Sequence, residues 1–111
     1  MTREFVYMDA FQKRWTKLGL NDNDLAELEN YLLKNPDAGA VIQDTGGLRK
    51  MRWALPNKGK SGSIRVLYID FVIDETMYMI DLFTKNEKQN LSMSEKNSIK
   101  QFIKNNLKLD E

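Results

Sequence analysis

Apolar and polar positions along this chain predict helices at both ends and strands in the middle. Residues Glu4 to Met8 alternate in the manner of a short strand. Asp9 is expected to cap a helix that ends at Gly19. The apolar stripe of this helix is formed by Phe11, Trp15 and Leu18.

A second helix is predicted directly after the first. It begins within the polar segment Asn21 to Asp24 and stops at Asn35-Pro36, because the residue before a proline disfavours the helical conformation. Its apolar stripe is Leu25, Leu28 and Leu32. The N-terminal third is therefore expected to be a pair of consecutive helices.

Strand patterns dominate the centre of the chain. Ala40 to Ile42 is a candidate short strand, and Thr45-Gly46-Gly47 is a turn signal. Leu48 to Ala54 alternates as a strand with one more polar face. Ile64 to Ile73 and Thr76 to Thr84 are rich in β-branched and aromatic residues, and a tight turn at Asp74-Glu75 would join them as an antiparallel hairpin.

The C-terminal segment turns helical again. Ser92 and Glu95 have the spacing of a capping box. The stripe that follows is Ile99, Phe102, Ile103 and Leu107. The order of elements predicts a single α+β domain over residues 1–111, with two N-terminal helices and a C-terminal helix packed on an antiparallel sheet.

Composition excludes several classes of protein and several kinds of site. The apolar runs are too short and too interrupted by charge to span a bilayer, and the N-terminus does not resemble a signal peptide, so we expect a cytoplasmic protein with no membrane partner. The chain has no Cys and no His, which excludes thiolate zinc sites, imidazole metal sites and His-dependent triads. We expect no metal and no cofactor, with catalysis left to the remaining polar residue types.

Charge is segregated although the formal net charge is only +1. No acidic residue stands between Asp44 and Asp70, and that interval holds Arg49, Lys50, Arg52, Lys58, Lys60 and Arg65. Such an asymmetry favours a basic face for a polyanion. A solvated basic loop is the alternative interpretation.

Four segments in a consistent order carry a family resemblance. They are Asn35 to Arg52 (NPDAGAVIQDTGGLRKMR), Lys58 to Tyr68 (KGKSGSIRVLY), Leu82 to Glu87 (LFTKNE) and Leu91-Ser92. Together they resemble the HigB-like branch of the RelE/ParE superfamily of bacterial toxins, over roughly residues 30 to 105. Residues 1 to 30 are similar only in their pattern of strand and helices.

The resemblance implies the toxin of a type II toxin–antitoxin system. Such toxins are mRNA interferases: they cleave mRNA in the ribosomal 30S A site without a metal, inhibit translation, and are neutralised by a cognate antitoxin, here expected to be a helix-turn-helix protein. Relatives of the same fold inhibit DNA gyrase instead. Because a fold does not determine a function, a non-catalytic inhibitor of a protein target stays the alternative.

Metal-free RNA cleavage needs a base for the 2′-OH, an acid for the leaving oxygen and positive charge at the phosphorane. Pairing across the predicted hairpin places Arg65 roughly opposite Thr84 and Lys85. By resemblance, Arg65 matches the strand arginine that stabilises the transition state. Lys60 and Lys85 are the other expected catalytic residues, and the expected RNA-binding residues are Lys58, Arg49, Lys50, Arg52 and Asn86.

Other interpretations of these residues stay open at the level of sequence. Arg65 could instead form a buried ion pair with Asp81. Tyr68 and Trp53 are predicted to be core or half-buried residues of the sheet. The best-known relatives have a tyrosine near the final helix, whereas this chain has none after Tyr78, which leaves stacking on the mRNA to another residue.

Overall fold

A five-stranded sheet forms the centre of the molecule. The structure is a computed structural model, and it describes residues 2–55, 62–85, 87 and 90–107. In chain order its strands are β1 (Glu4–Tyr7), β2 (Ala40–Val41), β3 (Arg49–Ala54), β4 (Ser63–Phe71) and β5 (Thr76–Thr84). They lie in the order β1-β5-β4-β3-β2. The predicted antiparallel neighbours β3, β4 and β5 are confirmed. The sheet as a whole is mixed, because β1 pairs with β5 in parallel.

The three helices are α1 (Asp9–Lys17), α2 (Asp22–Lys34) and α3 (Met93–Leu107). Local hydrogen bonds explain most of their ends. Asn21 and Asp24 form a reciprocal capping box at the start of α2, and Gly19 adopts the left-handed conformation (φ 76°) just after α1. The prediction that Asp9 caps α1 was wrong: the cap position is Met8, and Asp9 is the first helical residue. Its carboxylate there complements the positive end of the helix dipole.

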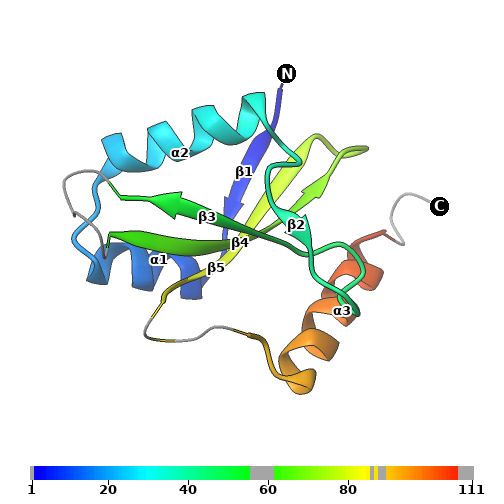
Figure 1. The fold of residues 1–111 in the computed structure, drawn as a ribbon. Coiled ribbons are helices and arrows are strands. Elements are labelled where there is room, and N and C mark those ends of the chain that lie inside the picture. The colour runs from blue at the N-terminus through cyan, green and yellow to red at the C-terminus, as the bar shows by residue number, and fades with distance from the viewer. Residues whose placement is uncertain (1, 56–61, 86, 88–89, 108–111) are drawn as a thin grey trace.

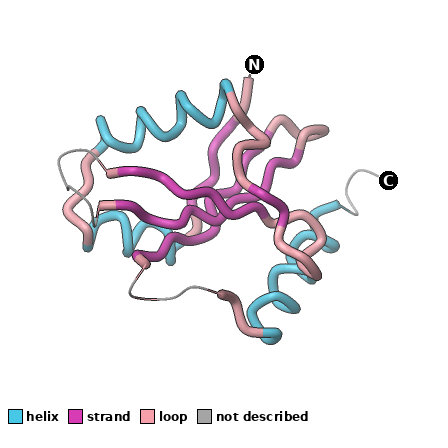
Figure 2. The backbone as a smooth tube through the Cα atoms, in the orientation of Figure 1, coloured by secondary structure: helices cyan, strands magenta, loops and turns pink. Residues whose placement is uncertain are grey.

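The helices lie on both faces of the sheet, which makes three layers (Figure 1). α1 and α2 cover one face, where Phe11, Trp15, Leu28 and Leu32 pack on alternate residues of β3, β4 and β5. α3 lies on the other face, where Ile103 packs on a second cluster of sheet residues. Figure 2 shows the strands between the α1–α2 pair and α3. Because side chains alternate along a strand, residues of odd number in β4, including Arg65, point to the α3 face.

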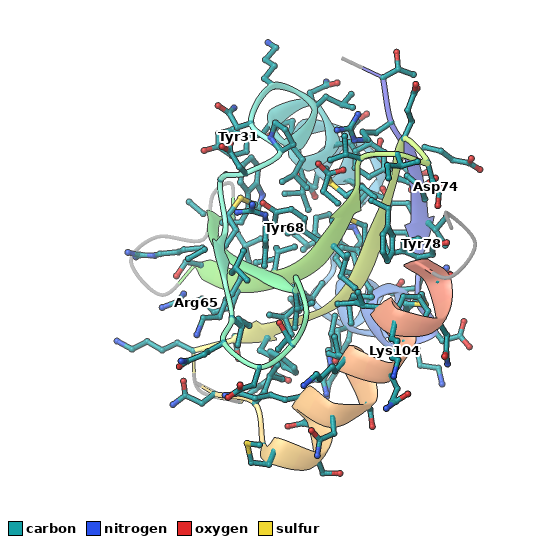
Figure 3. All side chains as sticks on the ribbon, turned by 90° about the vertical axis from the view of Figure 1, so that its right-hand side faces the viewer. Tyr31, Arg65, Tyr68, Asp74, Tyr78 and Lys104 are labelled. Carbon is teal, nitrogen blue, oxygen red and sulfur yellow. The ribbon has the colours of Figure 1, made fainter. Side chains whose placement is uncertain are left out.

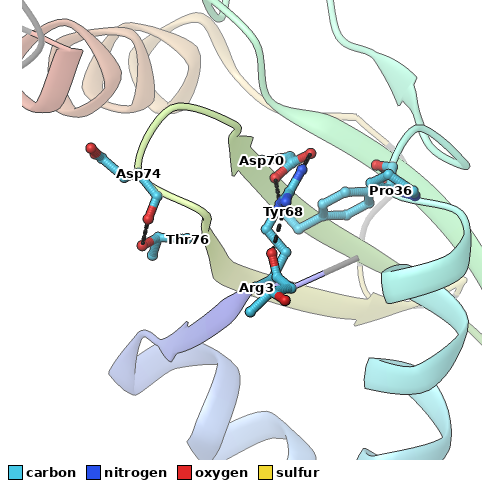
Figure 4. Close-up of polar contacts among 7 residues, drawn as sticks. Arg3, Pro36, Tyr68, Asp70, Asp74 and Thr76 are labelled. Carbon is cyan, nitrogen blue, oxygen red and sulfur yellow. Dashed lines mark hydrogen bonds and ion pairs between the residues drawn. The ribbon is translucent and has the colours of Figure 1, made fainter.

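A partly buried ion pair ties the N-terminus to the sheet (Figure 4). Arg3 donates from Nε to Asp70 Oδ1 at 2.7 Å and from Nη2 to Oδ2 at 3.2 Å. The hydrogen bond to Asp70 is the main cause that raises the pKa of Arg3, so the guanidinium stays charged at any physiological pH.

The register of the β4–β5 hairpin differs from the sequence prediction. Arg65 lies opposite Phe83 rather than Thr84 and Lys85. Two irregularities cause the difference: the turn takes four residues, 72–75, instead of two, and a bulge interrupts the ladder between Leu67 and Tyr68. Their effects on the pairing act in opposite directions, so the prediction erred by about one residue.

Candidate functional site

A pocket of about 120 Å³ lies between the sheet and the start of α3. Its apolar lining comes from Ile42, Leu67, Phe83 and Leu91, and its polar lining from Lys50, Arg65, Asn90 and Lys96. Three of these side chains are cationic, and no carboxylate is among the described residues of the lining. On the same volume measure, one water needs about 10–15 Å³, so a group as large as a phosphate can enter.

Arg65 supplies the most informative atom of this pocket. Its side chain extends from β4 at the end of the sheet remote from the β4–β5 turn, where Asp74 lies (Figure 3). Arg65 Nη1 is buried and has no hydrogen-bond partner within the described part of the chain. A buried charged donor without a partner is costly, and most such donors in native proteins are satisfied. The arrangement therefore suits an anionic ligand.

Two of the predicted RNA-binding residues share the face of Arg65, which was predicted to be catalytic. On β3, Lys50 is half-buried and lines the pocket, and the exposed Arg52 lies directly opposite Arg65 on the neighbouring strand. The fold thus brings Lys50, Arg52 and Arg65 together, as their positions on adjacent strands require.

Arg49 points to the opposite face of β3. Its Nη1 donates to the carbonyl of Gly39 at 2.6 Å, which ties β3 to the segment after α2. Lys85 is exposed just after β5 and is not part of the pocket lining. The remaining predicted residues, Lys58, Lys60 and Asn86, lie outside the described residues.

Asp81, the alternative partner considered for Arg65, forms its ion pair with Arg14 of α1 (Nε–Oδ1 3.0 Å). The same guanidinium reaches Glu87 Oε2 at 2.9 Å and lies 5.0 Å above the ring centroid of Phe83. Glu87 also accepts a hydrogen bond from the backbone N–H of Thr84, and this bond is the main reason why the pKa of Glu87 is lowered. Arg14 therefore holds the segment that follows β5 through Glu87, and it does so next to Phe83, which lines the pocket.

The loop between β2 and β3 positions the wall of the pocket that contains Ile42. Thr45 is fully buried, and its Oγ1 donates to the carbonyl of Ile42 at 2.7 Å and accepts from the N–H of Leu48 at 3.1 Å. Gly46 and Gly47 adopt positive φ angles, so the Gly-Gly pair is a backbone turn. This part of the segment Asn35 to Arg52, which carries the family resemblance, therefore has a structural role: it holds Ile42 and the first residues of β3 in place.

Tyr68 organises the preceding segment in the same way. It is fully buried, and its hydroxyl donates to the carbonyl of Pro36 at 2.9 Å (Figure 4). The same hydroxyl accepts from the N–H of Gly39 at 2.9 Å. Trp53 is half-buried against the ring of Tyr31, with centroids 5.2 Å apart. The prediction that Tyr68 and Trp53 are sheet residues rather than exposed RNA stackers is confirmed.

Sequence reasoning missed Lys96 as a member of the pocket. It follows the capping box, in which Ser92 N donates to Glu95 Oε1 and Glu95 N donates to Ser92 Oγ. The capping box marks the start of α3, but only the packing of α3 on the sheet brings Lys96 to the pocket that Arg65 lines. A single lysine on an amphipathic helix gives no sequence signal of that kind.

Comparisons with known proteins agree with this architecture. The family model described as "RelE toxin of RelE / RelB toxin-antitoxin system" matches residues 5–111. A solved structure of the E. coli toxin RelE in the free state, a mutant with two arginines replaced by alanine, is similar with a TM-score of 0.56 and 16% identity, covering 93% of this chain and 98% of that one. At that identity the likeness shows the fold alone. The chain belongs to the RelE toxin family of toxin–antitoxin systems.

Membrane-spanning helices and acidic metal clusters are both absent from the described residues. None of the helices there is long and apolar enough to cross a membrane. In the same part of the chain, acidic side chains do not gather in a group of three that could hold a metal ion.

Proposed function

We propose that this chain is a ribosome-dependent mRNA endonuclease that inhibits translation as the toxin of its toxin–antitoxin pair. The observation that carries the proposal is the cationic pocket with the buried, unpartnered Nη1 of Arg65 among the described residues. A protein that only occupies the surface of a target has no need for such an atom. An enzyme that stabilises a developing negative charge does need one.

In the proposed reaction, the 2′-oxygen of the RNA attacks the adjacent phosphorus, the 2′-proton leaves, and the P–O5′ bond breaks as the 5′-oxygen is protonated. Arg65 faces the phosphorane, whose charge is larger than that of the ground state, so its contribution appears mainly in the rate. Lys60 and Lys85 are the candidate proton carriers. Lys58, Arg52 and Asn86 are the candidate contacts to the rest of the RNA.

The proposed partners follow from family membership and from the resemblance to the HigB-like branch. We expect the toxin to act on mRNA in the 30S A site, where the ribosome presents an extended strand. A helix-turn-helix antitoxin is the expected inhibitor. We expect the toxin to need no cofactor for either interaction.

Induced expression of the chain, followed by mapping of mRNA ends with and without translation, tests this function. We expect new 5′-hydroxyl ends within coding regions that vanish when initiation is blocked. Arg65→Ala, expressed to the same level, is the control and should leave mRNA intact. Growth arrest with intact mRNA and changed DNA supercoiling would refute the proposal in favour of a gyrase-type target.

A further inference from the structure

We propose that Lys96 of α3 completes a three-cation phosphate site with Lys50 and Arg65, an inference that rests on the proposed function and extends it to the helix. The ligand is one backbone phosphate of the RNA. No sequence motif singles out this lysine, and its role comes from the packing of α3 against the sheet.

The first argument is geometric. The three cations come from three separate elements, β3, β4 and α3, and all of them line one pocket of about 120 Å³. Three positive charges that face one pocket attract an anion to it. Lys96 is half-buried, so part of its side chain is already held in place by its neighbours. Binding then costs less side-chain entropy than it would for a fully exposed lysine.

The second argument is chemical. Glu95, the nearest acidic residue in sequence, accepts the N–H of Ser92 through its Oε1, and no carboxylate is among the described residues that line the pocket. The rest of the lining is apolar apart from Asn90, and apolar walls lower the local dielectric, which strengthens the attraction between a cation and a phosphate. The pocket thus combines charge with partial exclusion of water, as expected for a phosphate site.

The same helix offers a matched control. Lys100 lies four residues further along α3, is exposed, and is not part of the pocket lining. Lys96→Ala and Lys100→Ala remove the same charge from the same helix. Both replace lysine by a residue of slightly higher helix propensity, so neither change should unfold α3. Their comparison separates a site from a general effect of net charge.

The experiment measures binding of a fluorescent 2′-O-methyl RNA trinucleotide, which has no free 2′-hydroxyl and cannot be cleaved. Anisotropy is recorded against protein concentration at several salt concentrations. We expect Lys96→Ala to weaken binding about 5- to 10-fold and to lower the salt slope by about 0.7, the value for one phosphate contact on a single strand. Lys100→Ala should match the wild type. Inorganic phosphate should compete in the wild type and compete less well in Lys96→Ala.

Equal affinity and equal salt slope for Lys96→Ala and the wild type would overturn the inference, and so would equal losses in the two lysine variants. The readout does not depend on catalysis. A Lys96-dependent slope in a protein that never cleaves mRNA would support the phosphate site and refute the proposed function. If cleavage requires Arg65, but Lys96→Ala changes neither RNA binding nor the cleavage rate, the proposed function is supported and the phosphate site is refuted.

Discussion

Arg52 and Arg65 lie directly opposite each other on neighbouring strands, β3 and β4. Like charges in this position destabilise an antiparallel pair. The chain nevertheless places two arginines there, and one of them, Arg65, lines the same pocket as Lys50 and Lys96. The repulsion is a cost of the free state, and a bound phosphate would relieve it.

Replacing one member of this pair should therefore stabilise the free protein and weaken RNA binding. We expect Arg52→Gln to raise the free energy of unfolding by roughly 0.2–1 kcal/mol at low salt, because the cross-strand repulsion is lost. The gain should shrink as salt screens the wild-type pair. Urea titrations at two salt concentrations measure it. A variant that is less stable than the wild type at low salt would show that the two arginines do not repel.

Tyr68 is predicted to matter for stability rather than catalysis. Tyr68→Phe removes the acceptor of the Gly39 N–H and the donor to the Pro36 carbonyl. A buried donor without a partner costs about 1–3 kcal/mol, and the free energy of unfolding should fall by that amount. The cleavage rate at a temperature where the variant is folded should stay close to that of the wild type. A large loss of rate in a fully folded Tyr68→Phe would assign the hydroxyl a role in the reaction.

Gly39 should tolerate no side chain because of its close approach to β3. A Cβ on Gly39 would lie 2.9 Å from the carbonyl oxygen of Lys50 and 3.1 Å from Cε1 of Tyr68. Overpacking of this kind typically costs about 1–3 kcal/mol, so Gly39→Ala should lower the melting temperature, and the shift of the β3 backbone should also reduce RNA affinity through Lys50. Ala38→Ser, at the exposed neighbouring position, is the control and should stay within about 0.5 kcal/mol. Thermal melts that show no difference between the two variants would contradict the close packing of Gly39 on β3.

Acid should release the segment after β5. The hydrogen bond from Thr84 N–H, with help from Arg14, lowers the pKa of Glu87 below its ordinary value of 4.5. A lowered carboxyl pKa stabilises the folded arrangement above the ordinary value, and that stabilisation is lost as pH falls through the folded pKa. We expect the NMR signal of the Thr84 amide to move below pH 4.5 and to follow the titration of Glu87. In Glu87→Gln the signal should not titrate, and a wild-type signal that stays constant through the acid range down to about pH 2 would argue against the contact.

Local signals explain why much of the fold was predictable from the sequence. Capping boxes such as Asn21 with Asp24, or a left-handed Gly19, are built from residues within four positions of one another, so their chemistry is visible in the sequence. Alternating apolar residues likewise revealed the strands that contain Arg65 and Lys50.

Relationships across space were predicted less well. The four-residue turn and the bulge between Leu67 and Tyr68 together moved the partner of Arg65 from Thr84 to Phe83, and no local residue pattern announces a bulge of that kind. Lys96 joins the pocket through the packing of α3 on the sheet. Arg14, whose guanidinium holds Asp81 and Glu87, was missed for the same reason, since its partners are more than 60 residues away along the chain.

The central claim is that Arg65 stabilises the transition state of mRNA cleavage, and one measurement tests it most directly. Single-turnover cleavage of mRNA on programmed ribosomes, at saturating toxin, compares the wild type with Arg65→Ala. Loss of one such donor should lower the rate about 100- to 1000-fold, while the melting temperature and antitoxin binding stay near those of the wild type. A folded Arg65→Ala that cleaves at the wild-type rate, or a wild-type protein that leaves ribosome-bound mRNA intact, would contradict the account.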